Sequence, residues 1–343
     1  MTHPVRTYAI ATLTPVVLIV AGAFGGGVWS WLALVYMTLF TFGLDQMIAA
    51  NDPGENPARD LPAADTLSAS LAVLHFALLP LVVWSISSAG HGIAPGVALF
   101  IGAGLFFGQV SNSNAHELIH RRDRRLFALG KWVYVTLLFG HHTSAHLKVH
   151  HRHAASPQDP NSARRGEGFY RFAWRAWIGS FREGYRAERE AIRKRGTGGT
   201  TPYVTYIAGA AAFALLALVF IGPDGLLAYV GLSAYAQMQL LLSDYVQHYG
   251  LTRSETAPGK YEPVGPAHSW NAGHWYSRHL MLNAPRHSDH HAHPARPYPF
   301  LRNAPDAPTL PSTLPAMAAL ALIPSLWRRV MTPALSEWEA TRA

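Results

Sequence analysis

Residues 7–24 read TYAIATLTPVVLIVAGAF, an apolar run without a single charged side chain. A helix needs roughly 20 such residues to cross about 30 Å of hydrocarbon. A second apolar run, residues 28–44, follows after the short glycine-rich turn Gly25–Gly27. We therefore expect the first run to stay as a membrane anchor rather than to be cleaved as a signal peptide. The beginning of the chain predicts a helical membrane protein.

Four more apolar runs extend this pattern, and all 28 Lys and Arg lie outside the runs. The six expected spans are residues 7–24, 28–44, 67–86, 95–112, 202–221 and 226–245. The short connectors at Gly25–Gly27, Ser87–Ala94 and Ile221–Leu226 contain no Lys or Arg. Because basic loops stay in the cytoplasm, both termini and the large portions 113–201 and 246–343 are expected there. The fold class is thus all-α integral membrane, one domain over residues 1–343 with a cytoplasmic histidine-rich cap.

Three further stretches are expected to be helical without crossing the membrane. Leu126–Gly140 contains Lys131, and a crossing there would invert all later charge asymmetry, so it is interpreted as a re-entrant or interfacial hairpin. Arg164–Arg195 mixes arginines with aromatic residues, which is typical of a helix on the membrane surface, although a solvated helix is the alternative. A last helix, Leu314–Val330, is interrupted by Pro324 and is expected to cover the cytoplasmic portion.

The composition limits the chemistry that the chain can perform. Of the 343 residues, 49% are hydrophobic and 14% charged, which suits a membrane protein with a substantial polar portion. The absence of cysteine excludes disulfides, haem–thiolate ligation and cysteine-held iron–sulfur clusters. The net charge of +8 follows the membrane topology, so it does not indicate nucleic-acid binding. In contrast, 19 histidines against 20 acidic residues indicate metal binding.

Sixteen of the histidines fall between His116 and His293, on the side that the topology makes cytoplasmic. His116 and His120 are four residues apart and share one helix face, and the HxxxHH sequence of residues 146–151 repeats that spacing with an extra neighbour. RHSDHH, residues 286–291, gives a third short helix, and one more histidine follows the last span. The nine candidate metal ligands are His116, His120, His146, His150, His151, His248, His287, His290 and His291.

Nine imidazoles exceed what one ion accepts, so two metal ions are the economical interpretation. Neutral imidazole suits iron, copper, nickel and zinc, and ligand type alone does not choose among them. HELIH, residues 116–120, also fits the HExxH pattern of a zinc protease with Glu117 as general base, but that reading leaves the other clustered histidines without a role. A metal transporter would need ionisable groups along the spans, where Asp45 and His75 are the main examples.

Taken in order, HELIH (116–120), HxxxHH (146–151), PQDP (157–160), DYVQHYGL (244–251) and RHSDHHAHP (286–294) resemble the membrane alkane 1-monooxygenases. These are relatives of the xylene monooxygenase hydroxylase and of the membrane fatty-acid desaturases. The resemblance covers nearly the whole chain and implies that the nine histidines bind two iron ions, with O2 as co-substrate. It also implies an apolar substrate that enters from the bilayer, and a bacterial inner membrane with the active site in the cytoplasm.

The chain departs from the family pattern at several positions. Ala145 stands where the second box usually has Glu, Asp244 and Gln247 stand where the third has Asn and Glu, and Arg121 replaces a usual Lys. Residues that contact metal ligands orient the imidazole rings. We therefore expect these changes to affect which substrate is used more than which type of reaction is catalysed. Candidates for such outer contacts are Glu117, Asp159, Asp244, Gln247 and Asp289. The remaining histidines of the region are not assigned as ligands: His141, His142, His153, His268, His274, His279 and His293.

The leading function is hydroxylation of the terminal carbon of an alkane, because only a metal-derived oxidant attacks such C–H bonds. Hydroxylation of an alkylbenzene or another small apolar molecule, and a desaturase-like reaction, remain alternatives. A tunnel between the first four spans, lined by apolar side chains, would suit the substrate, and no substrate-binding residue is named. Since nothing resembles a flavin, nicotinamide or iron–sulfur module, a rubredoxin- or ferredoxin-like carrier with its reductase is implied.

Six arginines form the expected cytoplasmic basic face. They would steer an acidic electron carrier, or they merely enforce the topology and bind anionic membrane lipid. These residues are Arg121, Arg122, Arg124, Arg125, Arg164 and Arg165.

Overall fold

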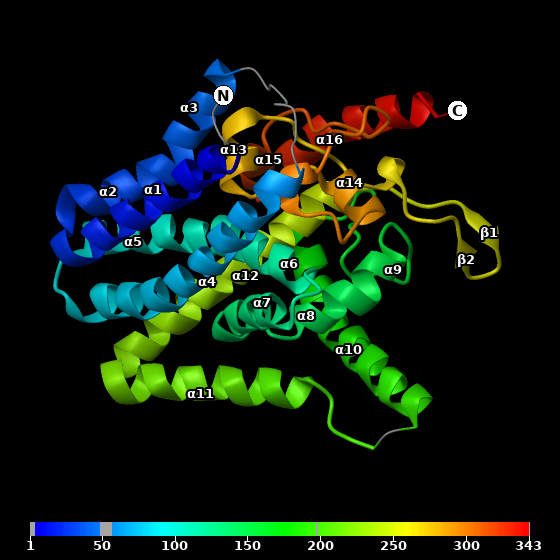
Figure 1. The fold of residues 1–343 in the computed structure, drawn as a ribbon. Coiled ribbons are helices and arrows are strands. Elements are labelled where there is room, and N and C mark those ends of the chain that lie inside the picture. The colour runs from blue at the N-terminus through cyan, green and yellow to red at the C-terminus, as the bar shows by residue number, and fades with distance from the viewer. Residues whose placement is uncertain (1–3, 49–56, 197, 343) are drawn as a thin grey trace.

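The computed structural model describes residues 4–48, 57–196 and 198–342 (Figure 1). It is nearly all helical, and six helical segments are long and apolar enough to cross a membrane, which confirms the predicted fold class and the number of spans. These segments are Val5–Gly25, Gly27–Met47, Leu61–Ser88, Ile93–Ile119, Tyr203–Ile221 and Pro223–His248. Four of the spans are helices α1 (Pro4–Gly25), α4 (Pro57–Ser88), α11 (Tyr203–Ile221) and α12 (Pro223–His248).

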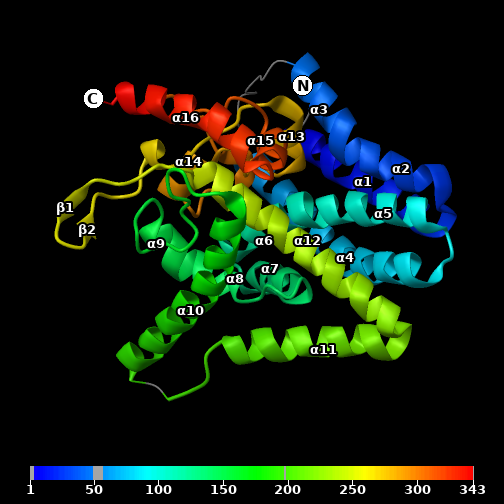
Figure 2. The same cartoon turned by 180° about the vertical axis from the view of Figure 1, so that it is seen from behind.

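The spans form three antiparallel hairpins whose tight turns lie together at one end of the molecule, at the left of Figure 1. The turn between the first two spans needs glycine, since Gly26 has a φ of 57°. Spans two and four pack backbone to backbone, because a Cβ on Gly102 would lie 2.9 Å from the amide nitrogen of Leu34. The view from behind shows α12 running diagonally across the other spans (Figure 2).

Spans two and four each contain a stretch of π-helix. Span two consists of α2 (Gly27–Val35), η1 (Tyr36–Phe40) and α3 (Thr41–Met47). Span four consists of α5 (Ile93–Leu105), η2 (Phe106–Ser111) and α6 (Asn112–Ile119). We expected span four to end at residue 112, where the apolar run ends, but the helix continues to Ile119. The polar extension is buried against other elements, so it does not need an apolar sequence.

Residues 124–153 form short helices beside the C-terminal end of span four. They are α7 (Arg124–Thr136), α8 (His142–Ala145), η3 (His146–His150) and α9 (His151–His153). The region 126–140, which we expected to be a re-entrant or interfacial hairpin, is instead the single helix α7 followed by a turn, and it is not among the helices that could cross a membrane. Helix α7 lies against α6 instead: a Cβ on Gly130 would lie 2.7 Å from the Ala115 carbonyl oxygen.

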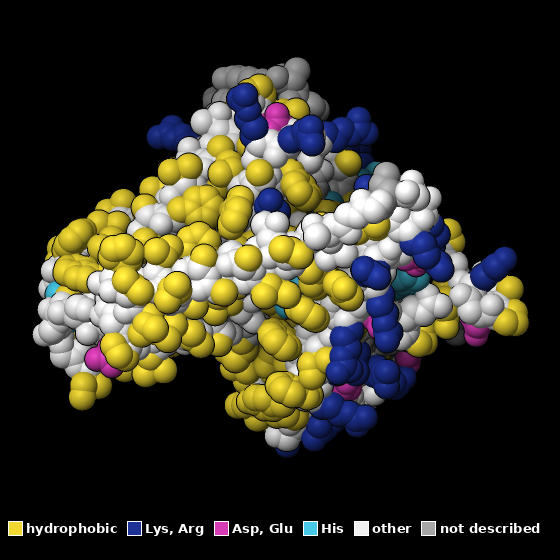
Figure 3. Space-filling view, turned by 90° about the horizontal axis from the view of Figure 1, so that it is seen from below, with side chains coloured by type: hydrophobic (Ala, Val, Ile, Leu, Met, Phe, Trp, Pro, Cys, Tyr) yellow, Lys and Arg dark blue, Asp and Glu magenta, His cyan; other side chains and the backbone are white. Residues whose placement is uncertain are grey.

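The basic segment forms α10 (Phe169–Arg195), a single amphipathic helix. Its buried residues recur every three or four positions, as expected for a helix with one packed face. They are Phe169, Phe172, Ala176, Ser180, Gly184 and Glu188. Figure 3 shows Lys and Arg side chains along the upper edge and at the lower right of the molecule, whereas the left part of that face is mostly hydrophobic. Basic side chains are thus unevenly distributed over this face of the molecule.

The C-terminal portion consists of short elements that cover the ends of the spans opposite the three tight turns. The expected helix 314–330 is instead two helices, α15 (Leu314–Ala321) and α16 (Pro324–Ala340), because Pro324 begins a new helix. A small antiparallel hairpin, β1 (Glu255–Ala257) with β2 (Lys260–Tyr261), is an addition that the sequence did not predict. The other elements are η4 (Pro266–His268), α13 (Trp275–Leu280), α14 (His287–Ala292) and η5 (Tyr298–Phe300).

Candidate metal centre

The nine histidines singled out in the sequence lie on five helical pieces that meet at the C-terminal end of span four. They separate into two groups, and within each group all ligand nitrogens lie within 4.8 Å of one another. The first group contains His116, His120, His146, His151 and His290. The second group contains His150, His248, His287 and His291. No carboxylate belongs to either group, so each is a pure imidazole donor set.

In the first group, the Nε2 atom of His151 lies close to three other Nε2 atoms. The distances are 3.1 Å to His120, 2.9 Å to His146 and 3.1 Å to His290. An imidazole nitrogen carries at most one proton, so at most one of these contacts is satisfied by a proton from His151. Two nitrogens bound at right angles about a metal at about 2.1 Å would be about 3.0 Å apart. The spacing therefore fits nitrogens that share a cation.

The second group also brings imidazole nitrogens close to one another. The Nε2 atom of His287 lies 3.0 Å from that of His248 and 3.1 Å from that of His291. The Nε2 atom of His150 is buried and has no hydrogen-bond partner, and the same is true of His116 in the first group. Buried nitrogens without partners are costly, and a metal ion would accept the lone pair of each.

The assignment of residues 146–151 to the two groups depends on the π-helix η3. We expected His146 and His150 to share a helix face, as residues four apart do in an α-helix. In a π-helix the hydrogen bond runs from residue i to residue i+5, so residues five apart align. His146 and His151 consequently meet in the first group, and His150 joins the second.

Burial keeps most of these imidazoles neutral, which is the form that binds a metal. It lowers the pKa of His120 to about 3, and it holds the pKa values of His146, His290 and His291 well below 6.5. His150 differs: burial also acts to lower its pKa, but the charge of Asp159 and its hydrogen bond raise it above 6.5.

Among the five residues expected to contact the metal ligands, Asp159 contacts one of the nine imidazoles. Its Oδ2 accepts a hydrogen bond from His150 Nδ1 at 2.9 Å, and it also accepts one from the Ser162 hydroxyl at 2.7 Å. Burial opposes the charge of Asp159, but His150 and these bonds hold its pKa below the usual value. The backbone carbonyl of His268 plays a similar part for His248, whose Nδ1 lies 3.3 Å away. No pattern in the sequence indicated this carbonyl contact.

The other four residues expected to contact the ligands have partners outside the two histidine groups. Glu117 lies 3.3 Å from the Arg121 side chain, and Asp244 accepts a hydrogen bond from Asn161 at 2.7 Å. Gln247 accepts from Ser243 and donates to the Ala284 carbonyl. Asp289 accepts from the Arg302 backbone N–H at 2.8 Å and pairs with His293 and Arg296.

A cavity of about 60 Å³ borders both groups, with His116, His146 and His287 in its wall. It lies between spans four and six and beside α15, whereas the substrate tunnel was expected between the first four spans. His142 and Tyr134 also line it, and neither was identified from the sequence as a site residue. His142 follows His141 directly, and nothing in that pair indicates which ring reaches the cavity.

The fold and the two histidine groups define a helical membrane protein with a candidate metal centre at the C-terminal ends of spans four and six. Residues 91–320 match the model of the fatty acid desaturase family. Alkane 1-monooxygenase 1 of Alcanivorax borkumensis is 31% identical over 339 residues, covering 95% of this chain and 82% of the relative. The chain belongs to the alkane 1-monooxygenases of the fatty acid desaturase family, which are membrane oxidoreductases.

Two further relatives widen the comparison. The alkane 1-monooxygenase of Pseudomonas putida is 34% identical over 272 residues, which cover 77% of this chain and 66% of the relative. The hydroxylase component of the xylene/toluene monooxygenase of Pseudomonas putida is 27% identical over 355 residues, covering 97% of this chain and 89% of the relative.

Proposed function

We propose that this protein is a di-iron monooxygenase that hydroxylates an apolar substrate, most favourably the terminal carbon of an alkane. The observation that carries the proposal is the convergence of buried imidazole nitrogens beside a cavity, in a chain whose relatives are named alkane 1-monooxygenases. The site would face the cytoplasm of a bacterial inner membrane, because the basic loops lie on that side of the spans.

The nine histidines of the two groups would hold the two irons, five around one and four around the other. When bound, the irons would activate O2 to attack an unactivated C–H bond, which amino-acid side chains alone cannot do. The protein's part would be to fix the ligands: Asp159 accepts a hydrogen bond from the Nδ1–H of His150, which would leave the Nε2 lone pair of the ring free.

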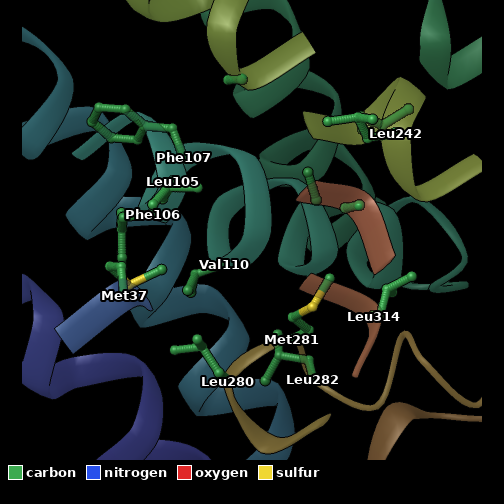
Figure 4. Packing of buried hydrophobic residues seen from close by; sticks show 14 of the residues in the cluster. Met37, Leu105, Phe106, Phe107, Val110, Leu242, Leu280, Met281, Leu282 and Leu314 are labelled. Atoms are coloured by element: carbon green, nitrogen blue, oxygen red, sulfur yellow. The ribbon is translucent and has the colours of Figure 1, made fainter. Parts of the chain in front are cut away.

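The cavity residues would bind the substrate and exclude water. Leu240, Met281, Leu314 and Ala318 supply apolar surface within the cavity that borders His116. Figure 4 shows Met281 and Leu314 close to one another, although they come from distant parts of the sequence. An apolar wall beside the histidines would hold a hydrocarbon end against them and protect the reaction from solvent.

Electrons would come from a rubredoxin- or ferredoxin-like carrier with its reductase. Such carriers are commonly acidic, and the exposed arginines around the histidine end would attract one. Arg122 is exposed between α6 and α7, and Arg124 and Arg125 are exposed in the first turn of α7.

Hydroxylation of an alkylbenzene is the second candidate function, because one relative is named as part of a xylene/toluene monooxygenase. A zinc protease is disfavoured, since Glu117 is paired with Arg121 and lies in neither histidine group. The remaining family alternative, a desaturase-like reaction, would give an alkene in place of an alcohol.

Metal analysis and product analysis of the purified protein test the proposal together. About two irons per chain are expected, with an alcohol formed from octane or toluene only when O2 and reduced carrier are present. One zinc without iron, with peptide hydrolysis in place of hydroxylation, would contradict it. An alkene product would instead favour the desaturase-like reaction.

A further inference from the structure

Helix α10 presents a stripe of exposed aromatic side chains. Tyr170, Trp174, Trp177 and Tyr185 follow one another at intervals of four, three and eight residues, so they lie on one side of the helix. All four are exposed, and Trp174 has 71% of its surface free. Because α10 is not among the helices that could cross a membrane, the stripe needs an explanation other than a span.

Arginines run along one flank of this aromatic stripe. Arg171, Arg182 and Arg189 are exposed and are separated by eleven and seven residues, which are close to three and two turns of helix. The three side chains therefore share one flank, roughly 60–80° around the helix axis from Trp174. A helix that lies in the plane of a membrane interface has this arrangement, with apolar aromatic side chains beside basic ones.

The charges on this flank are not neutralised by the protein. Within the described part of the chain, none of the three flank arginines makes an ion pair or a side-chain hydrogen bond. Basic residues farther from the stripe are paired instead: Arg186 lies 2.6 Å from Glu183, and Lys194 lies 2.7 Å from Glu190. The flank beside the aromatic stripe is thus left with uncompensated positive charge.

Contacts with spans five and six put the stripe at the level of the membrane interface. The Nε1–H of Trp177 donates to the side-chain oxygen of Gln237, in the C-terminal half of span six, at 2.8 Å. The hydroxyl of Tyr203, the first residue of α11, donates to the Phe181 carbonyl at 2.9 Å. Trp and Tyr are enriched where spans enter the headgroup region. In both Figure 1 and Figure 2, α10 runs obliquely to α11 rather than alongside it.

A positively charged aromatic surface at this level fits the headgroup of an anionic phospholipid. A guanidinium group binds phosphate through two parallel hydrogen bonds, and aromatic rings occupy the boundary between headgroups and acyl chains. We propose that the exposed side of α10 binds anionic phospholipid, with Arg171, Arg182 and Arg189 on the phosphates and Trp174 beside the acyl chains. This surface lies apart from the cavity at the histidines and does not depend on the proposed reaction.

An acidic electron carrier is a different partner for the same charges. A carrier would gain from the arginines alone, because it approaches from water. The aromatic stripe favours the lipid, since Trp177 contacts span six at a level where lipid rather than water surrounds the protein. The lipid accounts for the aromatic and the basic side chains together.

The covered side of α10 contacts the segment that carries three of the candidate metal ligands. Glu188 accepts hydrogen bonds from the Ser144 hydroxyl at 2.7 Å and from the Lys148 Nζ at 2.6 Å. A Cβ on Gly184 would lie 3.2 Å from the Cα of Ala145. A lipid on the exposed side would hold α10 against α8 and η3, and any ligand of the folded state raises its stability.

The main test follows the Tm of the purified protein in dodecyl maltoside while phosphatidylglycerol or phosphatidylcholine is added. In wild type, phosphatidylglycerol should raise the Tm and phosphatidylcholine should not. Arg182→Gln/Arg189→Gln should need about thirtyfold more phosphatidylglycerol for the same rise, because each basic side chain near an anionic surface contributes about a fivefold factor in affinity.

Arg186→Gln/Lys194→Gln is the matched control, since it removes the same charge from the same helix at residues that are already paired. It should titrate like wild type. An equal rise with the two lipids in wild type, or the same shift in both double variants, would overturn the proposal. So would weaker binding of an acidic ferredoxin to Arg182→Gln/Arg189→Gln with an unchanged lipid titration, because the arginines would then serve the carrier.

A second measurement tests whether α10 lies in the membrane interface. The chain has no cysteine, so Trp174→Cys allows a single NBD dye to be attached at the stripe, and Lys260→Cys places the same dye on the exposed strand β2 as a control. In vesicles of phosphatidylcholine and phosphatidylglycerol, the dye at position 174 should emit at a shorter wavelength, because lipid shields it from water. Equal emission from the two positions would show that α10 is solvated and would overturn the proposal.

Discussion

The Nδ1 atom of His150 lies 2.9 Å from the Oδ2 atom of Asp159, and both side chains are almost completely buried. This bond turns the opposite nitrogen of the ring, Nε2, toward the second histidine group, where it has no protein partner. A carboxylate on the far side of an imidazole fixes the tautomer and makes the free nitrogen more basic. Asp159 is therefore the residue outside the nine histidines with the clearest influence on the candidate metal centre.

Replacing Asp159 by Asn should weaken metal binding by the second group about 10- to 100-fold, because His150 would lose the charged acceptor that orients it. The measurement is the chelator concentration that removes metal from the purified protein. Asp123→Asn is the control, since Asp123 is an exposed cap of α7 that accepts the backbone N–H groups of Arg125 and Leu126. Equal chelator sensitivity of the two variants would show that Asp159 does not support the site.

His290 and His291 are neighbours on the six-residue helix α14 but belong to different groups. His291→Ala would leave three histidines in its group, whereas His290→Ala would leave four in the other. We expect His291→Ala to retain roughly one metal and His290→Ala to retain more, because a site with four ligands still completes a coordination shell. Metal content per chain, determined by mass spectrometry, checks this, and the same loss in both variants would contradict the division into two groups.

Replacing Ala145 by the glutamate that the family pattern leads us to expect there should destabilise this protein. Ala145 is buried against α10, where a Cβ added at Gly184 would lie 3.2 Å from the Cβ of Ala145 and would overlap the Tyr203 hydroxyl. Forcing a larger side chain into such a contact costs about 1–3 kcal/mol or more. Ala145→Glu should therefore lower the Tm measured in detergent, while Ala145→Ser should stay near wild type. An unchanged Tm for the glutamate variant would mean that α10 can move away.

Acid should destabilise the protein through His141, which burial keeps neutral by lowering its pKa to about 3. Its unfolded pKa is about 6.5, so the unfolded chain takes up the proton first as the pH falls below that value. The free energy of unfolding should then decrease by about 2 kcal/mol between pH 6.5 and pH 5 from this residue.

The variant that checks this effect is His141→Phe, because Phe139 and Phe181 already surround the ring and an aromatic side chain fits there. Its Tm should fall less than that of wild type when the pH is lowered from 7 to 5. Parallel pH profiles would show that His141 does not contribute to acid sensitivity.

The spans were predictable because hydrocarbon imposes a length and a composition on any helix that crosses it. The polar parts of the same helices were harder to predict. The apolar run of span four ends near residue 112, whereas the helix continues to Ile119 and carries His116 to the site. Its extension is stabilised by contacts with other elements, such as the hydrogen bond from the Asn114 side chain to the Ser68 carbonyl. Contacts of this kind leave no periodic pattern in the sequence.

The sequence by itself determined that this is a six-span helical protein with nine histidines gathered at one end, since hydropathy, loop charge and histidine spacing are local properties. Only the tertiary structure decided how those histidines divide. His146 joins His151 rather than His150 because η3 is wound as a π-helix, which brings residues five apart onto one side of the helix. Likewise, Gln109 and Gln239 line the same cavity because spans four and six approach closely at Gly108.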